Sequence, residues 1–221
     1  MNEITTLKER IKTGWILASI ASMLTVSIII WYISNPKSFI EYKLGYSSEM
    51  LFNLPVWFFT LLIVIGYTFY TIIALPFVKH HLFTVSWLKL IGIWAAIVSG
   101  IAEEIIFRHL LMDYLLSIEF SNMSQVLISG ITFGIAHCIW VLLRGEIKIA
   151  IPVIISTTIL GCLLAMLYIY TGRSTLAPIV AHILINIVIE PWLMLSAISG
   201  KWKVNKILFI KPPNNIIFYF S

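Results

Sequence analysis

Long runs of apolar residues, separated by short polar breaks, constrain this chain more than any other feature. Hydrophobic residues make up 60% of the chain and charged residues only 11%, whereas a soluble domain carries about 25% charge. One soluble core of this size cannot hide so much apolar surface from water. The sequence therefore indicates an integral membrane protein in contact with lipid, and it excludes soluble enzymes, disordered modules and ordinary nucleic-acid-binding proteins.

Six of the runs are long enough to cross a bilayer. A helix needs about 20 apolar residues to span about 30 Å of hydrocarbon. A helix can also satisfy the hydrogen bonds of its backbone N–H and C=O groups within one segment, as lipid requires. The runs lie near residues 14–33, 54–75, 88–116, 122–142, 149–171 and 176–198. We predict an all-α fold, a polytopic membrane helical bundle of about six transmembrane helices that forms a single membrane domain over residues 1–221.

The Lys and Arg residues are divided unequally between the two sides of this bundle. If the N-terminus lies inside, the inner segments hold eleven of the 15 Lys and Arg residues. Because cytoplasmic loops are enriched in these residues, we expect both termini to be cytoplasmic. We interpret residues 1–13 as an amphipathic leader and residues 201–221 as a basic, aromatic tail. The compact size and short loops favour a bacterial plasma membrane.

Ionisable side chains in the interiors of the predicted spans are confined to three of the six. Burying a charge at the centre of a membrane helix costs roughly 3 kcal/mol, so such groups normally face inward, form pairs and serve a function. They are Glu103, Glu104, Arg108, His109 and Asp113 in the third span, His137 in the fourth, and His182 and Glu190, with the polar Asn186, in the sixth.

Helical spacing brings these groups together. Residues four apart share one face of a helix, so Glu104 and Arg108 can form an ion pair. Glu103 is rotated by roughly 100° from Glu104 and can face a different neighbour. The same spacing of four relates Phe133 to His137 and His182 to Asn186. We therefore predict an internal polar cavity between the three helices.

The combination of side chains is suited to hydrolysis. A carboxylate beside histidines can activate water, either alone as a general base or through a bound metal. The sequence indicates no certain cofactor; if a divalent metal such as zinc is bound, Glu103, His137 and His182 are the ligands expected. An imidazole and an amide can stabilise the oxyanion of a tetrahedral intermediate. Hydrolysis of a peptide bond inside the membrane fits this set of groups.

Three short motifs are carried by these residues. Residues 103–108 read EExxxR, residues 133–137 read FxxxH and residues 182–186 read HxxxN. In this order, in separate spans, they resemble the CPBP family, which groups type II CAAX prenyl endopeptidases with bacterial bacteriocin-processing or immunity-type (Abi) proteases. The resemblance covers residues 85–200, the protease-like core, whereas the N-terminal spans within residues 14–84 carry no motif.

The resemblance implies an intramembrane endopeptidase that acts on a membrane-delivered peptide or a lipid-modified protein. It would make Glu103 the water-activating base, with His137 assisting, and would assign oxyanion binding to His182 and Asn186. It would make Glu104, Arg108 and Phe133 supporting residues. Both a metalloprotease mechanism and a metal-free glutamate mechanism remain open, although the familiar HExxH zinc pattern is absent.

Other interpretations fit the sequence less well. A site-2-type protease needs HExxH, a rhomboid needs a GxSx motif, and a presenilin-type protease needs two intramembrane aspartates, whereas Asp113 is the only Asp in the chain. The main alternative is a non-catalytic protein that uses the same cavity, such as a bacteriocin immunity or toxin-binding protein or a proton-linked transporter. A scaffold with a structural polar network is a third.

Two further polar features are predicted to lie outside the catalytic set. Glu190 precedes Pro191, and we expect it to stabilise a kink or face water. His109 and Asp113 are four residues apart and can pair with each other at the outer end of their span.

Overall fold

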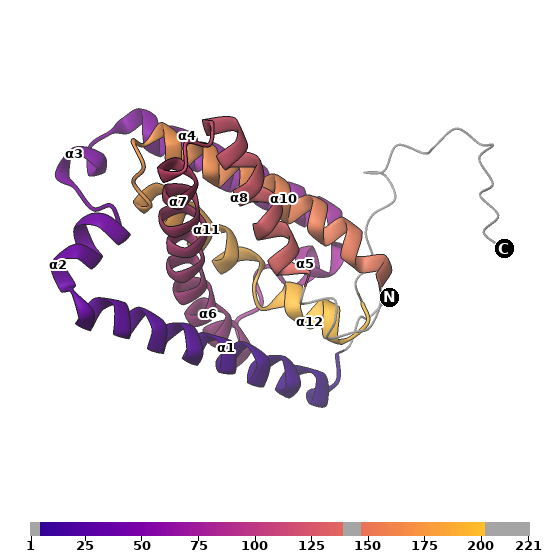
Figure 1. The fold of residues 1–221 in the computed structure, drawn as a ribbon. Coiled ribbons are helices and arrows are strands. Elements are labelled where there is room, and N and C mark those ends of the chain that lie inside the picture. The colour runs from indigo at the N-terminus through magenta and orange to yellow at the C-terminus, as the bar shows by residue number, and fades with distance from the viewer. Residues whose placement is uncertain (1–4, 139–146, 202–221) are drawn as a thin grey trace, which may run out of the picture.

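The computed structural model describes residues 5–138 and 147–201, and every regular element in these two ranges is helical (Figure 1). The predicted all-α helical bundle is confirmed. The elements are α1 (Leu7–Ser34), α2 (Pro36–Ser38), η1 (Phe39–Lys43), α3 (Ser48–Leu51), α4 (Leu54–Ala74), α5 (Pro76–His81), α6 (Trp87–Glu104), η2 (Ile105–Leu110), α7 (Leu111–Ser117), α8 (Asn122–His137), α10 (Ile147–Tyr170), α11 (Leu176–Ile189) and α12 (Trp192–Ile198).

Four helical segments are long and apolar enough to cross a membrane. They are Leu7–Ser34, Leu54–Ala74, Trp87–Ser117 and Ala150–Tyr170. A fifth is the pair α11 and α12, which is bent by 54°. The fourth predicted span differs from expectation, because α8 has 16 residues and a crossing needs about 20. Residues 139–142 of that predicted span, and the tail from residue 202 onward, lie outside the described residues.

The first span begins earlier than the leader interpretation suggests. Thr6 caps α1, and its side chain accepts from the Glu9 backbone N–H while the Glu9 carboxylate accepts from the Thr6 N–H. This reciprocal capping box satisfies two of the free N–H groups at the helix start. The described part of the predicted leader is therefore continuous with the span in one helix of 28 residues.

The third span forms the central column of the bundle. In Figure 1, α6 and α7 run as one upright column, and α1 crosses its lower end. Between them, η2 is a π-helix that starts directly after the two adjacent glutamates. Such short π-segments often occur at functional sites. This column packs on α1 and α11, while α11 also packs on α4.

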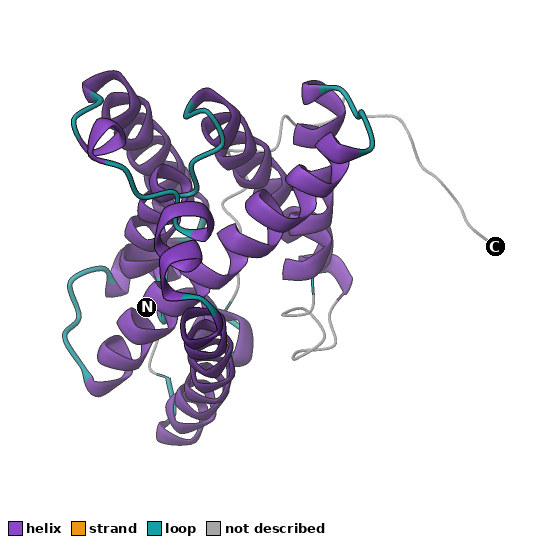
Figure 2. Ribbon diagram, turned by 60° about the vertical axis from the view of Figure 1, so that its left-hand side comes forward, coloured by secondary structure: helices purple, strands orange, loops and turns teal. Residues whose placement is uncertain are grey.

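The helices α8 and α10 form the most extensive pair and approach each other closely. A Cβ built on Gly161 would lie 2.9 Å from the Cα of Gly130. Only glycine permits such an approach, which is typical of helix contacts in membranes. Figure 2 shows the same bundle of helices joined by loops after a turn of 60°.

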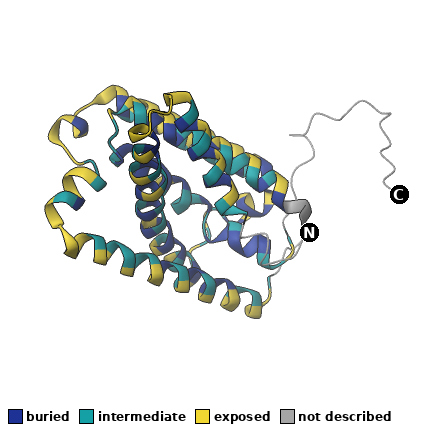
Figure 3. Cartoon of the chain, viewed as in Figure 1, coloured by how far each residue is buried: buried dark blue, intermediate teal, exposed yellow. Residues whose placement is uncertain are grey.

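Apolar side chains cover much of the outside of the bundle. Figure 3 shows exposed positions along the outer side of α1, whereas buried positions are more frequent on the column and on α11. Trp15 and Ile33 of α1 are each 71% exposed. An apolar exterior of this kind is suited to lipid rather than to water.

Candidate active site

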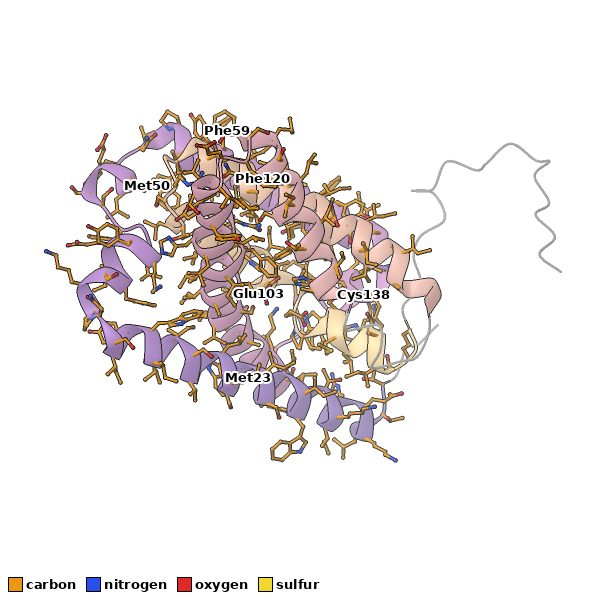
Figure 4. The ribbon with its side chains drawn as sticks, viewed as in Figure 1. Met23, Met50, Phe59, Glu103, Phe120 and Cys138 are labelled. Carbon is orange, nitrogen blue, oxygen red and sulfur yellow. The ribbon has the colours of Figure 1, made fainter. Side chains whose placement is uncertain are left out.

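A cavity of about 140 Å³ lies inside the bundle where the three motif-bearing helices meet. Its wall includes Glu103 of α6, Phe133 and His137 of α8, and His182 and Asn186 of α11. Figure 4 places Glu103 near the centre of the bundle. Side chains from three helices, up to 83 positions apart in the sequence, are thus brought to one cavity.

Glu103 projects into this cavity and lies between the two histidines. Its Oε2 is 3.5 Å from Nε2 of His137 and 3.9 Å from Nε2 of His182. The same oxygen is buried and forms no hydrogen bond. Both distances exceed those of normal hydrogen bonds, so the carboxylate oxygen remains available to another molecule.

Glu104, one residue further along the helix, is fully engaged. Its Oε2 accepts from Nε of Arg108 at 2.7 Å, which confirms the predicted ion pair. Its Oε1 accepts from Nδ1 of His182 at 2.9 Å. Arg108 also donates to Oγ of Ser129, which in turn donates to the Phe107 carbonyl at 3.0 Å. Glu104 and Arg108 are both completely buried, and the network ties α6, η2, α8 and α11 together.

Each histidine is oriented by a hydrogen bond from its Nδ1. Nδ1 of His137 donates to the Phe133 carbonyl at 2.9 Å, since a carbonyl can only accept. Nδ1 of His182 donates to Glu104. In a neutral ring the other nitrogen, Nε2, is then an acceptor. Both Nε2 atoms point toward Glu103, so three acceptor atoms converge on one region of the cavity.

Phe133 supports both imidazoles by packing. Its fully buried ring lies 4.3 Å from the His137 ring and 5.6 Å from the His182 ring, between ring centroids. The Arg108 guanidinium lies 5.2 Å from the centroid of the same ring. Such a side chain fixes ring orientation without taking part in chemistry.

Asn186 lies one helical turn beyond His182 on α11. Its Nδ2 donates to Oγ of Ser99 at 3.4 Å, a long hydrogen bond. The amide therefore lines the cavity with part of its donor capacity unused.

Two imidazoles and a carboxylate are ligand types that zinc accepts. Within residues 5–138 and 147–201, however, no group of three His, Cys, Asp or Glu side chains is placed to hold a metal ion.

Several cavity residues were not singled out by the sequence. Ser99 bonds Asn186, and Tyr67 of α4 and Leu17 of α1 form part of the wall. The last two lie in spans without motifs, and no local signal marks them. Glu190 lies at the bend between α11 and α12, as expected from Pro191, and it also lines the cavity. A signal for it existed, because it continues the spacing of four from His182 and Asn186.

Comparison with known protein families bears on this geometry. The family model described as type II CAAX prenyl endopeptidase Rce1-like matches residues 84–188, a segment that contains all three motifs. Over this segment the chain is similar to the Rce1-like family. The resemblance inferred from the motifs is thereby confirmed, and at family level the Rce1-like region is related to CAAX-type intramembrane proteases. No curated protein and no solved structure gave a significant match to the chain.

Proposed function

We propose that this protein is an intramembrane endopeptidase that hydrolyses a peptide bond in a membrane-delivered peptide or a lipid-modified protein. The observation that carries the proposal is the contrast between adjacent glutamates. Glu104 is saturated by Arg108 and His182, whereas Glu103 presents a buried, unbonded oxygen beside two Nε2 atoms. A water molecule, with two hydrogens to donate, matches a place where acceptors converge.

Glu103 is the general base in this proposal. It takes a proton from the water as the water oxygen attacks the carbonyl carbon of the peptide bond. His137, 3.5 Å from Glu103, helps to hold the water and to pass the proton onward. When the C–N bond breaks, the proton is delivered to the departing amine, so that a carboxylic acid and an amine result.

His182 and Asn186 bind the oxyanion that forms on the carbonyl oxygen. Asn186 supplies an amide N–H. Since Nδ1 of His182 already donates to Glu104, a donation from its Nε2 requires the doubly protonated ring, whose charge Glu104 balances. Phe133, Glu104 and Arg108 position these groups.

The test uses wild type and Glu103→Gln, reconstituted in nanodiscs and incubated with a mixed library of lipidated and unlipidated membrane peptides. Mass spectrometry identifies the products, with and without a chelator. We expect cleavage by wild type, none by Glu103→Gln, and no effect of the chelator. Loss of activity with the chelator would instead assign a divalent metal to Glu103, His137 and His182. A folded wild type that cleaves nothing would favour a toxin-binding or transport protein.

We further propose that both termini are cytoplasmic in a bacterial plasma membrane, on the basis of the bias in positive charge. Labelling of single cysteines, introduced at Lys37 in the loop after the first span and at Lys8 near the N-terminus of a variant without Cys138 and Cys162, tests the orientation. A membrane-impermeant reagent should label only the cysteine at position 37 from outside the cell.

A further inference from the structure

The wall of the cavity contains two carboxylates but, among the described residues, no Lys or Arg. Among the described residues that line it, the ionisable side chains besides Tyr67 and Tyr70 are Glu103, Glu190, His137 and His182, and none is Lys or Arg. Most of the remaining wall is apolar. Carboxylates in a cleft with low-dielectric walls produce a strong local field that attracts cations and repels anions.

The bend between α11 and α12 places Glu190 in this wall. The helix α11 ends at Ile189, and the Glu190 backbone N–H still donates to the Asn186 carbonyl at 2.8 Å. The bend packs closely on α6, because a Cβ on Gly92 would lie 2.7 Å from Cδ of Pro191. A glycine at position 92 is required for this contact, which fixes the position of Glu190 relative to the column that bears Glu103.

Lys89 of α6 attracts Glu190 electrostatically, but its ammonium group is hydrogen-bonded to backbone groups. Its Nζ donates to the carbonyls of Ile187, Val188 and Glu190, the last at 2.8 Å. These carbonyls belong to the last turn of α11 and the bend, where helical acceptors are left free. Lys89 forms no ion pair with the Glu190 carboxylate in the described part of the chain.

One oxygen of Glu190 is consequently left without a partner. Its Oε2 is buried and forms no hydrogen bond. An unsatisfied buried carboxylate oxygen is costly, because water no longer solvates it. In a cavity that admits a substrate, a donor from that substrate can compensate the cost.

We propose that Glu190 binds a positively charged group of the substrate, namely a Lys or Arg side chain close to the cleaved bond. This inference rests on the proposed peptidase function. It makes the enzyme selective for peptides with a basic residue beside the scissile bond and unfavourable to acidic residues there. A substrate cation between Glu190 and Glu103 would offset the repulsion between the two carboxylates.

The experiment uses enzyme in nanodiscs and compares three peptides that differ at a single position, which carries Lys, its uncharged isostere norleucine, or Glu. This position is moved in turn to each site on both sides of the cleaved bond. At one position, wild type should cleave the Lys peptide with a kcat/KM about 30-fold or more above that of norleucine, as expected for a desolvated charge pair. In Glu190→Gln this ratio should fall to about 1, and Glu190→Lys should reverse it in favour of Glu. Glu119→Gln, an exposed carboxylate outside the cavity, should keep the wild-type ratio.

Equal cleavage of the Lys and norleucine peptides by wild type at every position would overturn the proposal, as would an unchanged ratio in Glu190→Gln. The wild-type measurement decides the matter even if the variants do not fold. Binding of fluorescent Lys and norleucine peptides to wild type and Glu190→Gln is measured in parallel. If wild type cleaves neither peptide, the proposed peptidase function is wrong. Independently of cleavage, equal binding of the Lys and norleucine peptides would overturn the role of Glu190.

Discussion

Two polar clusters of this protein share one helical column but differ in how completely they are bonded. The cavity cluster comprises Glu103, His137, His182 and Asn186; the Asp113 cluster comprises His109, Asp113, Gln125, Tyr168 and Arg173. In the Asp113 cluster, Oδ1 of Asp113 accepts from Arg173 at 2.7 Å and from Tyr168 at 2.9 Å, and Oδ2 pairs with His109 at 3.0 Å. In the cavity cluster, Glu103 lies 3.5 and 3.9 Å from its histidines.

The difference separates structural from chemical roles. A carboxylate whose acceptor sites are filled by protein donors holds helices together, and Asp113 ties α7 to α10 and to the loop that precedes α11. A carboxylate with an unbonded oxygen at a cavity can act on another molecule. Composition alone does not distinguish the two clusters, since each contains an acid and at least one imidazole.

Replacement of His137 should cause the largest loss of activity among the following changes. His137→Ala removes an imidazole beside Glu103, and acid–base groups of this kind contribute about 100- to 10,000-fold. We expect kcat to fall about 1,000-fold, measured by single-turnover cleavage in nanodiscs. His109→Ala in the Asp113 cluster is the matched control and should stay within about 3-fold of wild type, because surface-type pairs contribute little. Similar losses in both variants would contradict the comparison.

Arg108 tests the buried network beneath the cavity. Arg108→Met leaves the Glu104 carboxylate buried without its charge partner, and breaking such pairs costs about 3–5 kcal/mol. We expect a loss of that size in the free energy of unfolding, measured by denaturant titration in mixed micelles. Arg173→Met breaks the partly exposed pair with Asp113 and should cost about 1 kcal/mol. If the two variants were equally stable, burial would not explain a difference in stability between the two ion pairs.

Asn186 should affect turnover rather than stability. Loss of an oxyanion donor typically reduces kcat about 100- to 1,000-fold, and because His182 remains, we expect Asn186→Ala to lose about 100-fold. KM should stay near that of wild type, since the interaction forms in the transition state. Ser99→Ala keeps the amide while removing its bonded hydroxyl and serves as the control. A rise in KM with unchanged kcat would exclude the oxyanion role.

Asp113→Asn should have the smallest effect. The Asp113 side chain is 38% exposed, and partly exposed ion pairs contribute about 1 kcal/mol or less. The midpoint temperature of thermal unfolding in detergent should fall slightly. The cleavage rate should remain within about 2-fold of that of wild type. A large loss of activity would mean that the Asp113 cluster also takes part in the reaction.

Much of the fold followed from residue type and spacing. Apolar runs of about 20 residues predict the membrane helices, and the spacing of four predicts the Glu104–Arg108 and His109–Asp113 pairs, both of which form. The short α8 and the π-segment η2 were not predicted. Hydropathy reports where the chain is apolar, but it does not report where backbone hydrogen bonding changes.

The motif residues of the site could be named from the sequence, but its walls could not. Tyr67 and Leu17 reach the cavity from spans that carry no motif, and only tertiary packing places them there. Glu190 has the right spacing, yet the following Pro191 suggests a kink that could direct its side chain anywhere. The position of Gly92 against Pro191 decides the direction, and such a contact between distant residues leaves no local signal.

The most direct test of the central claim sets the two carboxylates of the column against each other. Wild type, Glu103→Gln and Asp113→Asn are reconstituted in the same vesicles. Their free energies of unfolding should agree within about 1 kcal/mol, and each protein then receives one equivalent of a cleavable peptide. We predict that wild type and Asp113→Asn cleave at similar rates, whereas Glu103→Gln is slower by about 1,000-fold or more. Cleavage by Glu103→Gln at the wild-type rate would contradict the assignment of Glu103 as the base.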